Sequence, residues 1–226
     1  EMARAVVVDN GAGTAKFGFA GERNPRVVMP NCTAVPHRSQ TKLVGDETED
    51  RKKVPDFSKL TYTRPHSRGY LVDRRCQEDV WARAFGKGKL DVNPEERSLL
   101  VTEPLFTPRR AQEECDELVF ETFGFRAQYR CCAPLLAALN FKNDFPTSQF
   151  ARSPAHLVVD AGYSFTHAVP CFDFHALNYA AKRVNVGGKL LTNFLKEGVS
   201  YRHFNVLEET FVMNKVKEDC CFVSLD

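Results

Sequence analysis

The chain has 226 residues, and its 31 basic and 29 acidic side chains give a formal charge of +2. This length suits one large domain or two small ones with a buried core. The near balance of charge argues against a polybasic tail as the dominant feature. No apolar run approaches the roughly 18 residues that a membrane helix needs, so no membrane partner is expected. The eight cysteines form no Cys-x-x-Cys pair, which favours reduced structural thiols over a zinc site.

The chain opens with an apolar run over residues 5–8, and a second apolar stretch over 17–21 follows at once. The pair Asn10-Gly11 between them is a strong hairpin signal, because both turn positions favour positive φ. Residues 31–62 are polar and charged. We expect them to form a small inserted lobe or a loop region rather than a second core.

The rest of the first half predicts alternating helices and strands. Helical spacing of apolar residues extends over 76–86, and residues 98–102 are typical of a buried strand. Thr107 predicts the N-cap of a helix over 108–124 with proline at its first position. Another helix is expected from residue 134 onward.

The opening pattern returns after a stretch, residues 146–154, that is expected to be a linker. An apolar run over 156–159 leads into the turn 160–164, and a second apolar stretch follows over 168–172. A last helix is predicted over about 208–223. Because the opening unit recurs about 150 residues later, the sequence indicates an internal duplication.

Two strand–Asp–turn units carry the chemistry that the sequence suggests. A tight glycine-containing turn directs backbone N–H groups at one spot, which suits phosphate oxygens. Asp9 and Asp160 end the two preceding strands and can hold a divalent cation, usually through water. Lys16 can reach a phosphate as a point charge. Gly187 and Gly188 offer backbone N–H groups at a helix N-terminus, where anions bind. Either turn alone is typical of an ordinary β-hairpin. The prediction of a phosphate site therefore rests on the presence of both turns.

Several sequence blocks resemble the actin family. They are DNGAG at 9–13 with Lys16, GFAG at 18–21, LVTEPL at 100–105, FETF at 120–123, DAGYSFTH at 160–167 and KE at 217–218. The block NVGGKLLTN at 185–193, together with VKEDC at 216–220, is closer to the nuclear actin-related members of the family than to actin itself. The resemblance covers nearly the whole chain.

The resemblance implies an α/β fold of duplicated ribonuclease-H-like lobes with a nucleotide cleft between them, C-terminally incomplete in this chain. It places the first lobe at 1–146, with a small polar inserted lobe at about 31–62, and the start of the second lobe at 147–226. The implied ligand is ATP with a divalent cation, Mg²⁺ or Ca²⁺. Whether the natural chain ends at Asp226 stays open at this point.

The resemblance also implies a set of site residues, in which Asp9 and Asp160 face the metal through water. The residues implied in nucleotide binding are Asp9, Asn10, Gly11, Ala12, Gly13, Lys16, Asp160, Gly162, Tyr163, Ser164, Gly188, Lys217 and Glu218. On residue pattern alone, Lys217 and Glu218 are equally typical of a solvated helix face. The glutamine that orients the attacking water in actin aligns with Ala133, which cannot orient water. ATP binding without turnover, and no catalytic residue, is therefore expected.

The implied function is that of a scaffold subunit in a nuclear chromatin-remodelling complex for histone variant exchange, with a Snf2-type ATPase among its partners. Localisation would be nuclear with some protein in the cytoplasm, and contact with nucleosomal DNA stays open. Two alternatives remain: an ATPase or sugar-kinase-like phosphotransferase of the actin superfamily, and a cytoskeletal actin-like protein. The charged segment 31–62 stands where actin has an apolar loop that engages the next subunit, so filaments are not expected.

Overall fold

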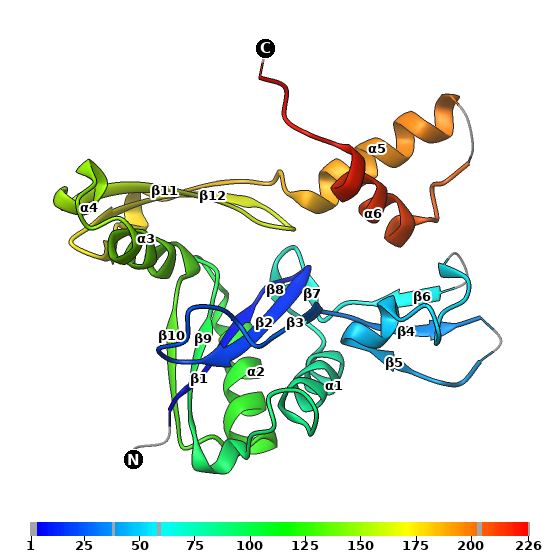
Figure 1. Ribbon diagram of the computed structural model, residues 1–226, viewed down its shortest axis with the longest axis horizontal. Coiled ribbons are helices and arrows are strands. Elements are labelled where there is room, and N and C mark those ends of the chain that lie inside the picture. The colour runs from blue at the N-terminus through cyan, green and yellow to red at the C-terminus, as the bar shows by residue number, and fades with distance from the viewer. Residues whose placement is uncertain (1–3, 38, 58–59, 203–204, 226) are drawn as a thin grey trace.

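A computed structural model of the protein describes residues 4–37, 39–57, 60–202 and 205–225. Helices and strands alternate along this part of the chain (Figure 1), which confirms the α/β class. The α-helices are α1 (Arg74–Phe85), α2 (Arg109–Asp116), α3 (Ala133–Asp144), α4 (Gln149–Arg152), α5 (Gly188–Arg202) and α6 (Thr210–Cys220). Other helical turns are η1 (Gly45–Glu49), η3 (Pro94–Glu96) and η5 (Asn178–Ala180), and η4 (Glu117–Thr122) is a π-helix.

The first half is built on a mixed sheet. Its strands are β1 (Val6–Asn10), β2 (Thr14–Phe19), β3 (Val27–Pro30), β9 (Ser98–Thr102) and β10 (Ala127–Cys131), in the order β10-β9-β1-β2-β3. β1 and β2 form the predicted hairpin, in which Asp9 lies opposite Lys16. β1 runs parallel to β9 and β9 runs parallel to β10, so their carboxyl ends share one edge of the sheet.

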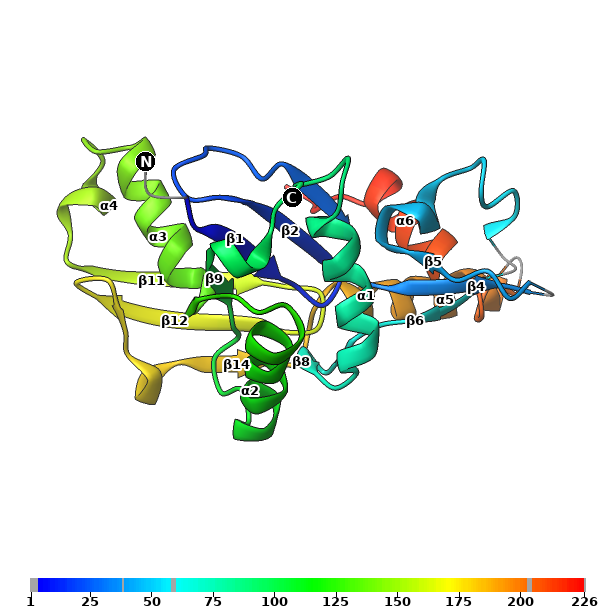
Figure 2. The same cartoon turned by 90° about the horizontal axis from the view of Figure 1, so that it is seen from below.

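Helix α1 packs against this sheet and completes the main core. Its Val80, Trp81, Ala84 and Phe85 recur at helical spacing and are all buried, as the sequence predicts. The Phe85 ring meets the Phe17 ring of β2 edge-on, with centroids 5.8 Å apart. α1 and α2 lie on the same side of the sheet in Figure 2. The packing fixes the sheet edge at which β1 and β9 end.

The predicted start of the helix after residue 107 is wrong by one position. Thr107 does not cap it: its hydroxyl donates to the carbonyl oxygen of Pro104 at 2.7 Å, and Pro108 is the N-cap. After α2 the helix widens into the π-helix η4, which places Leu118 and Val119 in the core. Proline, which lacks an N–H donor, is tolerated at the cap because nothing precedes it in the helix.

The second half repeats a hairpin at the centre of its own sheet. The strands are β11 (Ala155–Ala161), β12 (Thr166–Phe172), β13 (His175–Ala176) and β14 (Lys182–Val184), and β12 pairs antiparallel with the other three. The hairpin β11–β12 corresponds to the predicted repeat of the opening unit. The stretch predicted as a linker contains α4, whose first turn is capped by Ser148. α6 is shorter than the predicted last helix at both ends.

Residues 33–63 include a small sheet with strands β4 (Thr33–Pro36), β5 (Leu43–Val44) and β6 (Leu60–Thr63), in the order β5-β4-β6. Residues 38, 58 and 59 of the predicted inserted lobe lie outside the described residues. We call this part, with η1, the inserted lobe. It buries Ala34, Leu43 and Val54, so it has a small apolar centre of its own.

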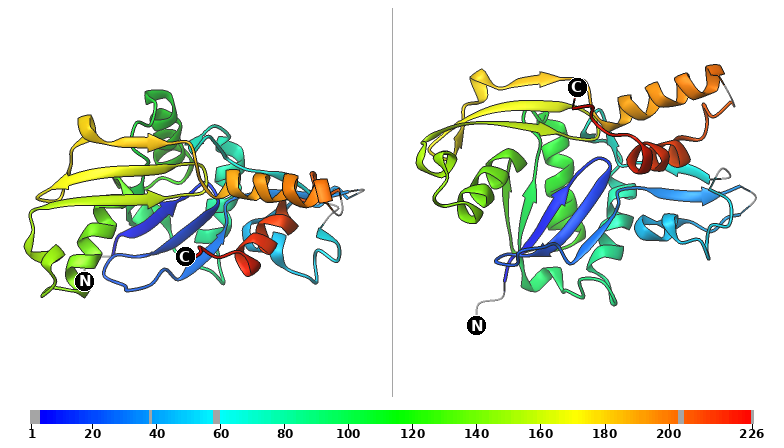
Figure 3. Two further views of the ribbon diagram at one scale, coloured as in Figure 1. Left: turned by 90° about the horizontal axis from the view of Figure 1, so that it is seen from above. Right: turned by 45° about the horizontal axis from the view of Figure 1, so that its top comes forward.

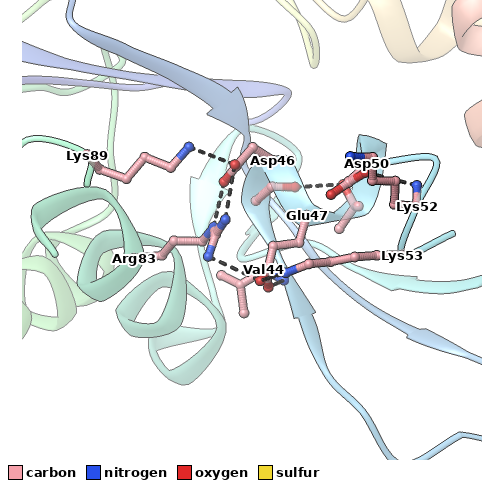
Figure 4. A network of polar contacts seen from close by, with 10 residues as sticks. Val44, Asp46, Glu47, Asp50, Lys52, Lys53, Arg83 and Lys89 are labelled. Atoms are coloured by element: carbon pink, nitrogen blue, oxygen red, sulfur yellow. Dashed lines mark hydrogen bonds and ion pairs between the residues drawn. The ribbon is translucent and has the colours of Figure 1, made fainter. Parts of the chain in front are cut away.

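A polar network ties the inserted lobe to α1 (Figure 4). The Asp46 carboxylate of η1 accepts hydrogen bonds from Arg83 Nε at 2.5 Å and from Lys89 Nζ at 2.7 Å. Partial burial alone would raise the pKa of Asp46, but the bonds from Arg83 and Lys89 outweigh it and lower that pKa to about 2. Arg83 also pairs with Glu47 at 3.2 Å. These hydrogen bonds and ion pairs therefore hold the inserted lobe against the first half.

The two halves face each other, with the second sheet, α5 and α6 on one side and the first sheet on the other (Figures 1 and 3). A short hairpin, β7 (His66–Ser67) and β8 (Tyr70–Leu71), extends from the first half towards the second. On α6, the Phe211 ring stacks on Phe57 and on Tyr62 of the inserted lobe, with centroids 5.2 Å apart in each pair. The lobe boundary at 146/147 stays a prediction.

The cysteines of the described chain are free. Cys32, Cys76, Cys132 and Cys171 are buried, Cys115 and Cys131 are half-buried, and Cys220 and Cys221 are exposed. The described part of the chain holds no cluster of three or more His, Cys, Asp or Glu side chains placed to bind a metal ion. None of its helices combines the length and apolar character needed to cross a bilayer.

Candidate functional site

A cleft of about 480 Å³ lies between the two hairpin turns and the facing ends of α5 and α6. This volume is in the range of sites that bind small organic ligands. All thirteen residues that the resemblance assigns to nucleotide binding line it: Asp9, Asn10, Gly11, Ala12, Gly13, Lys16, Asp160, Gly162, Tyr163, Ser164, Gly188, Lys217 and Glu218. The structure thus brings together residues that are up to 209 positions apart in the chain (9 to 218).

In the first turn, each carboxylate oxygen of Asp9 accepts a hydrogen bond. Thr102 at the end of β9 donates its hydroxyl to Asp9 Oδ1 at 2.7 Å and accepts from the Asn10 N–H at 3.1 Å. Lys16 Nζ donates to Asp9 Oδ2 at 2.7 Å. One donor of the Lys16 ammonium is therefore paired with Asp9, and Lys16 also lines the cleft. Asp9 is orientated by its neighbours at the parallel edge of the sheet.

A buried amide network supports the first turn from behind. Asn31 is fully buried, and its Nδ2 donates to the carbonyl oxygen of Gly11 at 2.9 Å. Gln77 of α1 donates to Asn31 Oδ1 at 3.0 Å, and the Asn31 N–H donates to the Gly13 carbonyl at 3.0 Å. Satisfied buried amides of this kind rigidify the backbone that they contact. Sequence reasoning missed Asn31 and Gln77, since no local motif marks either residue.

The second turn places Asp160 close enough to Asp9 of the first turn for the two charges to interact. Burial raises the pKa of the Asp160 carboxyl, and the nearby negative charge of Asp9 raises it further. His167 and Lys16 act in the opposite direction. Two carboxylates that repel each other across a cleft form an attractive position for a divalent cation, whose charge would relieve both. The pair Asp9 and Asp160 fits the water-mediated coordination that Mg²⁺ prefers.

The helix N-terminus at Gly187 and Gly188 differs from the prediction. The N–H groups of Gly188 and Lys189 donate to the carbonyl oxygens of Gly162 and Tyr163, at 3.0 and 2.8 Å. These two donors hold the second turn, so they are not free for an anion. A Cβ atom at Gly187 would lie 2.7 Å from the Tyr163 carbonyl oxygen, which explains why glycine stands here.

Lys217 is not on a solvated helix face. Its ammonium donates to the Gly188 carbonyl at 3.1 Å, to Thr192 Oγ1 at 3.0 Å and to Asn214 Oδ1 at 3.0 Å. The three donors of the ammonium thus each have a protein acceptor. Glu218 accepts from the Asn214 side chain at 2.8 Å. Lys217 joins α6 to the start of α5, while the Glu218 carboxylate also lines the cleft.

Ala133 lines the cleft at the start of α3, and His167 lines it from β12. His167 is 1% exposed, and its Nε2 has no hydrogen-bond partner among the described residues. Burial, and then the charge of Arg183, lowers the pKa of His167. The ring therefore borders the cleft with an unpartnered nitrogen that is itself buried. The methyl group of Ala133 offers no donor or acceptor there.

Arg64 is a further contact that the sequence did not indicate. Its Nη1 donates to the carbonyl oxygens of Gly13 at 3.0 Å and Ala12 at 3.3 Å. Its guanidinium also lies 4.8 Å from the centre of the Tyr163 ring. Arg64 therefore contacts both turns, although it is about 50 residues from the first and 100 from the second. A lone arginine in a polar segment gives no sequence signal of such a contact.

Comparison with known proteins identifies the family. The family model described as Actin matches residues 1–226. The chain is 45% identical to actin-related protein 6 of Oryza sativa subsp. indica over 221 residues, 98% of this chain and 50% of the relative. It is 41% identical to actin-related protein 6 of Arabidopsis thaliana over 225 residues (100% and 53%) and 39% identical to that of Drosophila melanogaster over 227 residues (100% and 56%). The chain spans about half the length of these curated relatives. It belongs to the actin family, as its motifs predicted.

Proposed function

We propose that the cleft binds ATP together with a divalent cation, Mg²⁺ or Ca²⁺, and that the nucleotide is a structural ligand. The observation that carries the proposal is the meeting of two Asp-containing turns at one cleft, close enough for the charge of Asp9 to raise the pKa of Asp160. A ligand that binds only the folded state stabilises it by mass action, by about 2.7 kcal/mol at 100 times its Kd. Neither hydrolysis nor group transfer is needed for this role.

The absence of turnover is the second part of the proposal. Ala133 lines the cleft. The resemblance to actin implies that it stands where a water-positioning side chain is needed, so a bound water would lack one of its partners. The alternative is an ATPase or sugar-kinase-like phosphotransferase, favoured by the unpartnered Nε2 of His167 in the same cleft. This alternative requires a base within reach of the attacking group.

Two measurements distinguish structural ATP binding from an ATPase or phosphotransferase activity. Calorimetric titration of the full chain with Mg·ATP is expected to show saturable binding that Asp160→Asn weakens by about tenfold, a loss of about 1.4 kcal/mol. Phosphate release is expected to stay at the level of a protein-free blank. Steady release that His167→Ala abolishes would instead establish the enzyme, and a flat titration would remove ATP as the ligand.

We propose further that the protein acts as a scaffold subunit of a nuclear chromatin-remodelling complex for histone variant exchange, beside a Snf2-type ATPase. The similarity to proteins named actin-related protein 6 supports a role within the actin-related branch of the family. Localisation is then mainly nuclear, with some protein in the cytoplasm, and filaments are not formed. Contact with nucleosomal DNA is a separate question that crosslinking of the purified complex answers.

The assembly role is tested by tagging the endogenous protein and purifying it from nuclear extract at moderate salt. Mass spectrometry is expected to recover a Snf2-type ATPase and histone-exchange subunits. Recovery alone, or with cytoskeletal proteins from the cytoplasmic fraction, would contradict the proposal and favour the cytoskeletal alternative. That alternative also predicts pelleting at high speed after salt is added, whereas a scaffold subunit stays in the supernatant.

A further inference from the structure

Arg64 contacts both turns of the cleft without lining the cleft itself. It lies two residues before the β7–β8 hairpin, which extends towards the second half (Figure 1). One guanidinium nitrogen donates to the carbonyl oxygens of Ala12 and Gly13, and the central carbon of the group lies over the Tyr163 ring, 4.8 Å from its centroid. A single side chain therefore connects a backbone segment of the first half with an aromatic ring of the second.

Tyr163 also touches the first turn directly. A Cβ atom at Gly13 would lie 3.0 to 3.1 Å from three atoms of the Tyr163 side chain, so the glycine permits the close approach. Because Arg64 bonds to the carbonyl of the same glycine, Gly13, Tyr163 and Arg64 form one three-part contact between the turns. We call this contact the turn clasp.

The chemistry of the turn clasp is specific to arginine. A planar guanidinium can donate in its plane to carbonyl oxygens while its face lies on an aromatic ring. A lysine in the same place would keep the positive charge but lose the planar stacking surface. The clasp thus differs from a general electrostatic attraction between a cation and a phosphate ligand.

We propose that Arg64 is a positioning residue that acts through Tyr163 to set the separation of the two turns before any ligand arrives. The inference rests on the proposed nucleotide site, because it explains how that site is pre-formed. A pre-formed site spares the ligand the ordering of two loops, and this raises affinity. Arg64 makes this contribution from behind the turns, without contacting the ligand.

The first test measures the affinity of the full chain for a fluorescent ATP analogue with Mg²⁺. Arg64→Met, Arg64→Lys and Tyr163→Leu are each expected to weaken binding by about tenfold. The double variant Arg64→Met/Tyr163→Leu is expected to lose no more than either single change, because both remove the same contact. Arg68→Met, which removes an exposed arginine four residues away, is the matched control and is expected to bind as the wild type does.

Wild-type affinity in Arg64→Lys would show that charge alone matters and would overturn the proposal. Fully additive losses in the double variant would overturn it as well. Arg64→Lys keeps the charge and most of the length of the side chain, so it guards against a variant that fails only because it does not fold.

The second test needs no nucleotide and separates the clasp from the proposed function. Hydrogen exchange of the ligand-free protein is expected to speed up several-fold at residues 161–165 when Arg64, 97 or more positions away, is changed to Met. If the wild type binds no nucleotide but this effect is present, the proposed function fails and the clasp stands. If exchange at 161–165 is unchanged, the clasp is refuted even where nucleotide binds.

Discussion

At the scale of single residues, His66 makes stability depend on pH. Burial, together with the charge of Arg64, lowers the pKa of His66 to about 4 from its ordinary 6.5. Between these two values the unfolded chain takes up a proton that the folded chain does not, so stability is lost as the pH falls from 6.5 to 4. We expect a loss of about 1–3 kcal/mol over this range.

The measurement is urea denaturation at pH 7 and pH 4.5. His66→Gln is expected to flatten the pH dependence, and His37→Gln, which changes an exposed histidine, is expected to keep the wild-type slope. An unchanged slope in His66→Gln would show that another group causes the loss.

Gly69 combines a positive φ with a close contact to the second half. Its φ is +86°, and a Cβ atom would lie 1.9 Å from Cε1 of Phe165 in the second half. Gly21 has nearly the same φ, +85°, with nothing within 4 Å, so it is a matched control. Gly69→Ala is expected to cost about 1–3 kcal/mol more than Gly21→Ala in thermal or chemical denaturation. Equal losses would mean that Phe165 moves freely.

Single residues also show what the sequence could and could not predict. Asp9, Asp160 and the glycines around them were identifiable because each sits in a local motif. Asn31 and Arg64 were not, since their partners lie 20 and 51 positions away and nothing local marks either one. Contacts of this kind depend on the tertiary fold, which residue pattern alone does not specify.

At the scale of elements, Lys217 determines how α6 joins α5. Its ammonium has acceptors in Gly188, Thr192 and Asn214. Lys217→Met keeps the length of the side chain but removes three hydrogen bonds to part-buried acceptors. We expect a loss of about 1–3 kcal/mol and faster hydrogen exchange in α6. Lys215→Met, which removes an exposed lysine of the same helix, is expected to leave both measurements unchanged.

The helices were predictable where their apolar spacing was regular, as in α1. The junction of α2 with η4 was not, because a π-helix depends on packing of Leu118 and Val119 in the core and not on residue preference. The short helix α4 was missed because four residues between prolines give no periodicity. The sequence therefore predicted the type of an element more often than it predicted where that element begins and ends.

At the scale of the whole molecule, the Phe211 stack joins the inserted lobe to the helix that carries Lys217 and Glu218. Stacked aromatic pairs contribute about 0.5–1.5 kcal/mol each beyond the area that they bury. Phe211→Ala is expected to release a fluorescent ATP analogue about tenfold faster, as the two halves separate more often. Tyr201→Ala, which removes a 91% exposed ring from α5, is the control.

Stopped-flow fluorescence measures the release, and small-angle scattering of the ligand-free protein measures the separation of the halves. An unchanged rate in Phe211→Ala would show that the stack is not part of the release pathway. Because the contact is apolar, the change in release rate caused by Phe211→Ala is expected to vary little with salt, unlike the change caused by removing an exposed ion pair.

The distribution of the cysteines has a consequence for labelling. Burial raises the pKa of Cys115 to about 11 and also raises the pKa values of Cys32, Cys76, Cys131, Cys132 and Cys171. The thiolate is the reactive form, so these groups react slowly with alkylating dyes at neutral pH. The exposed Cys220 and Cys221, where α6 ends, react first. The sequence thus carries a dye-attachment point at the end of the helix that holds Phe211, and a fluorophore placed there is expected to report separation of the two halves without an engineered cysteine.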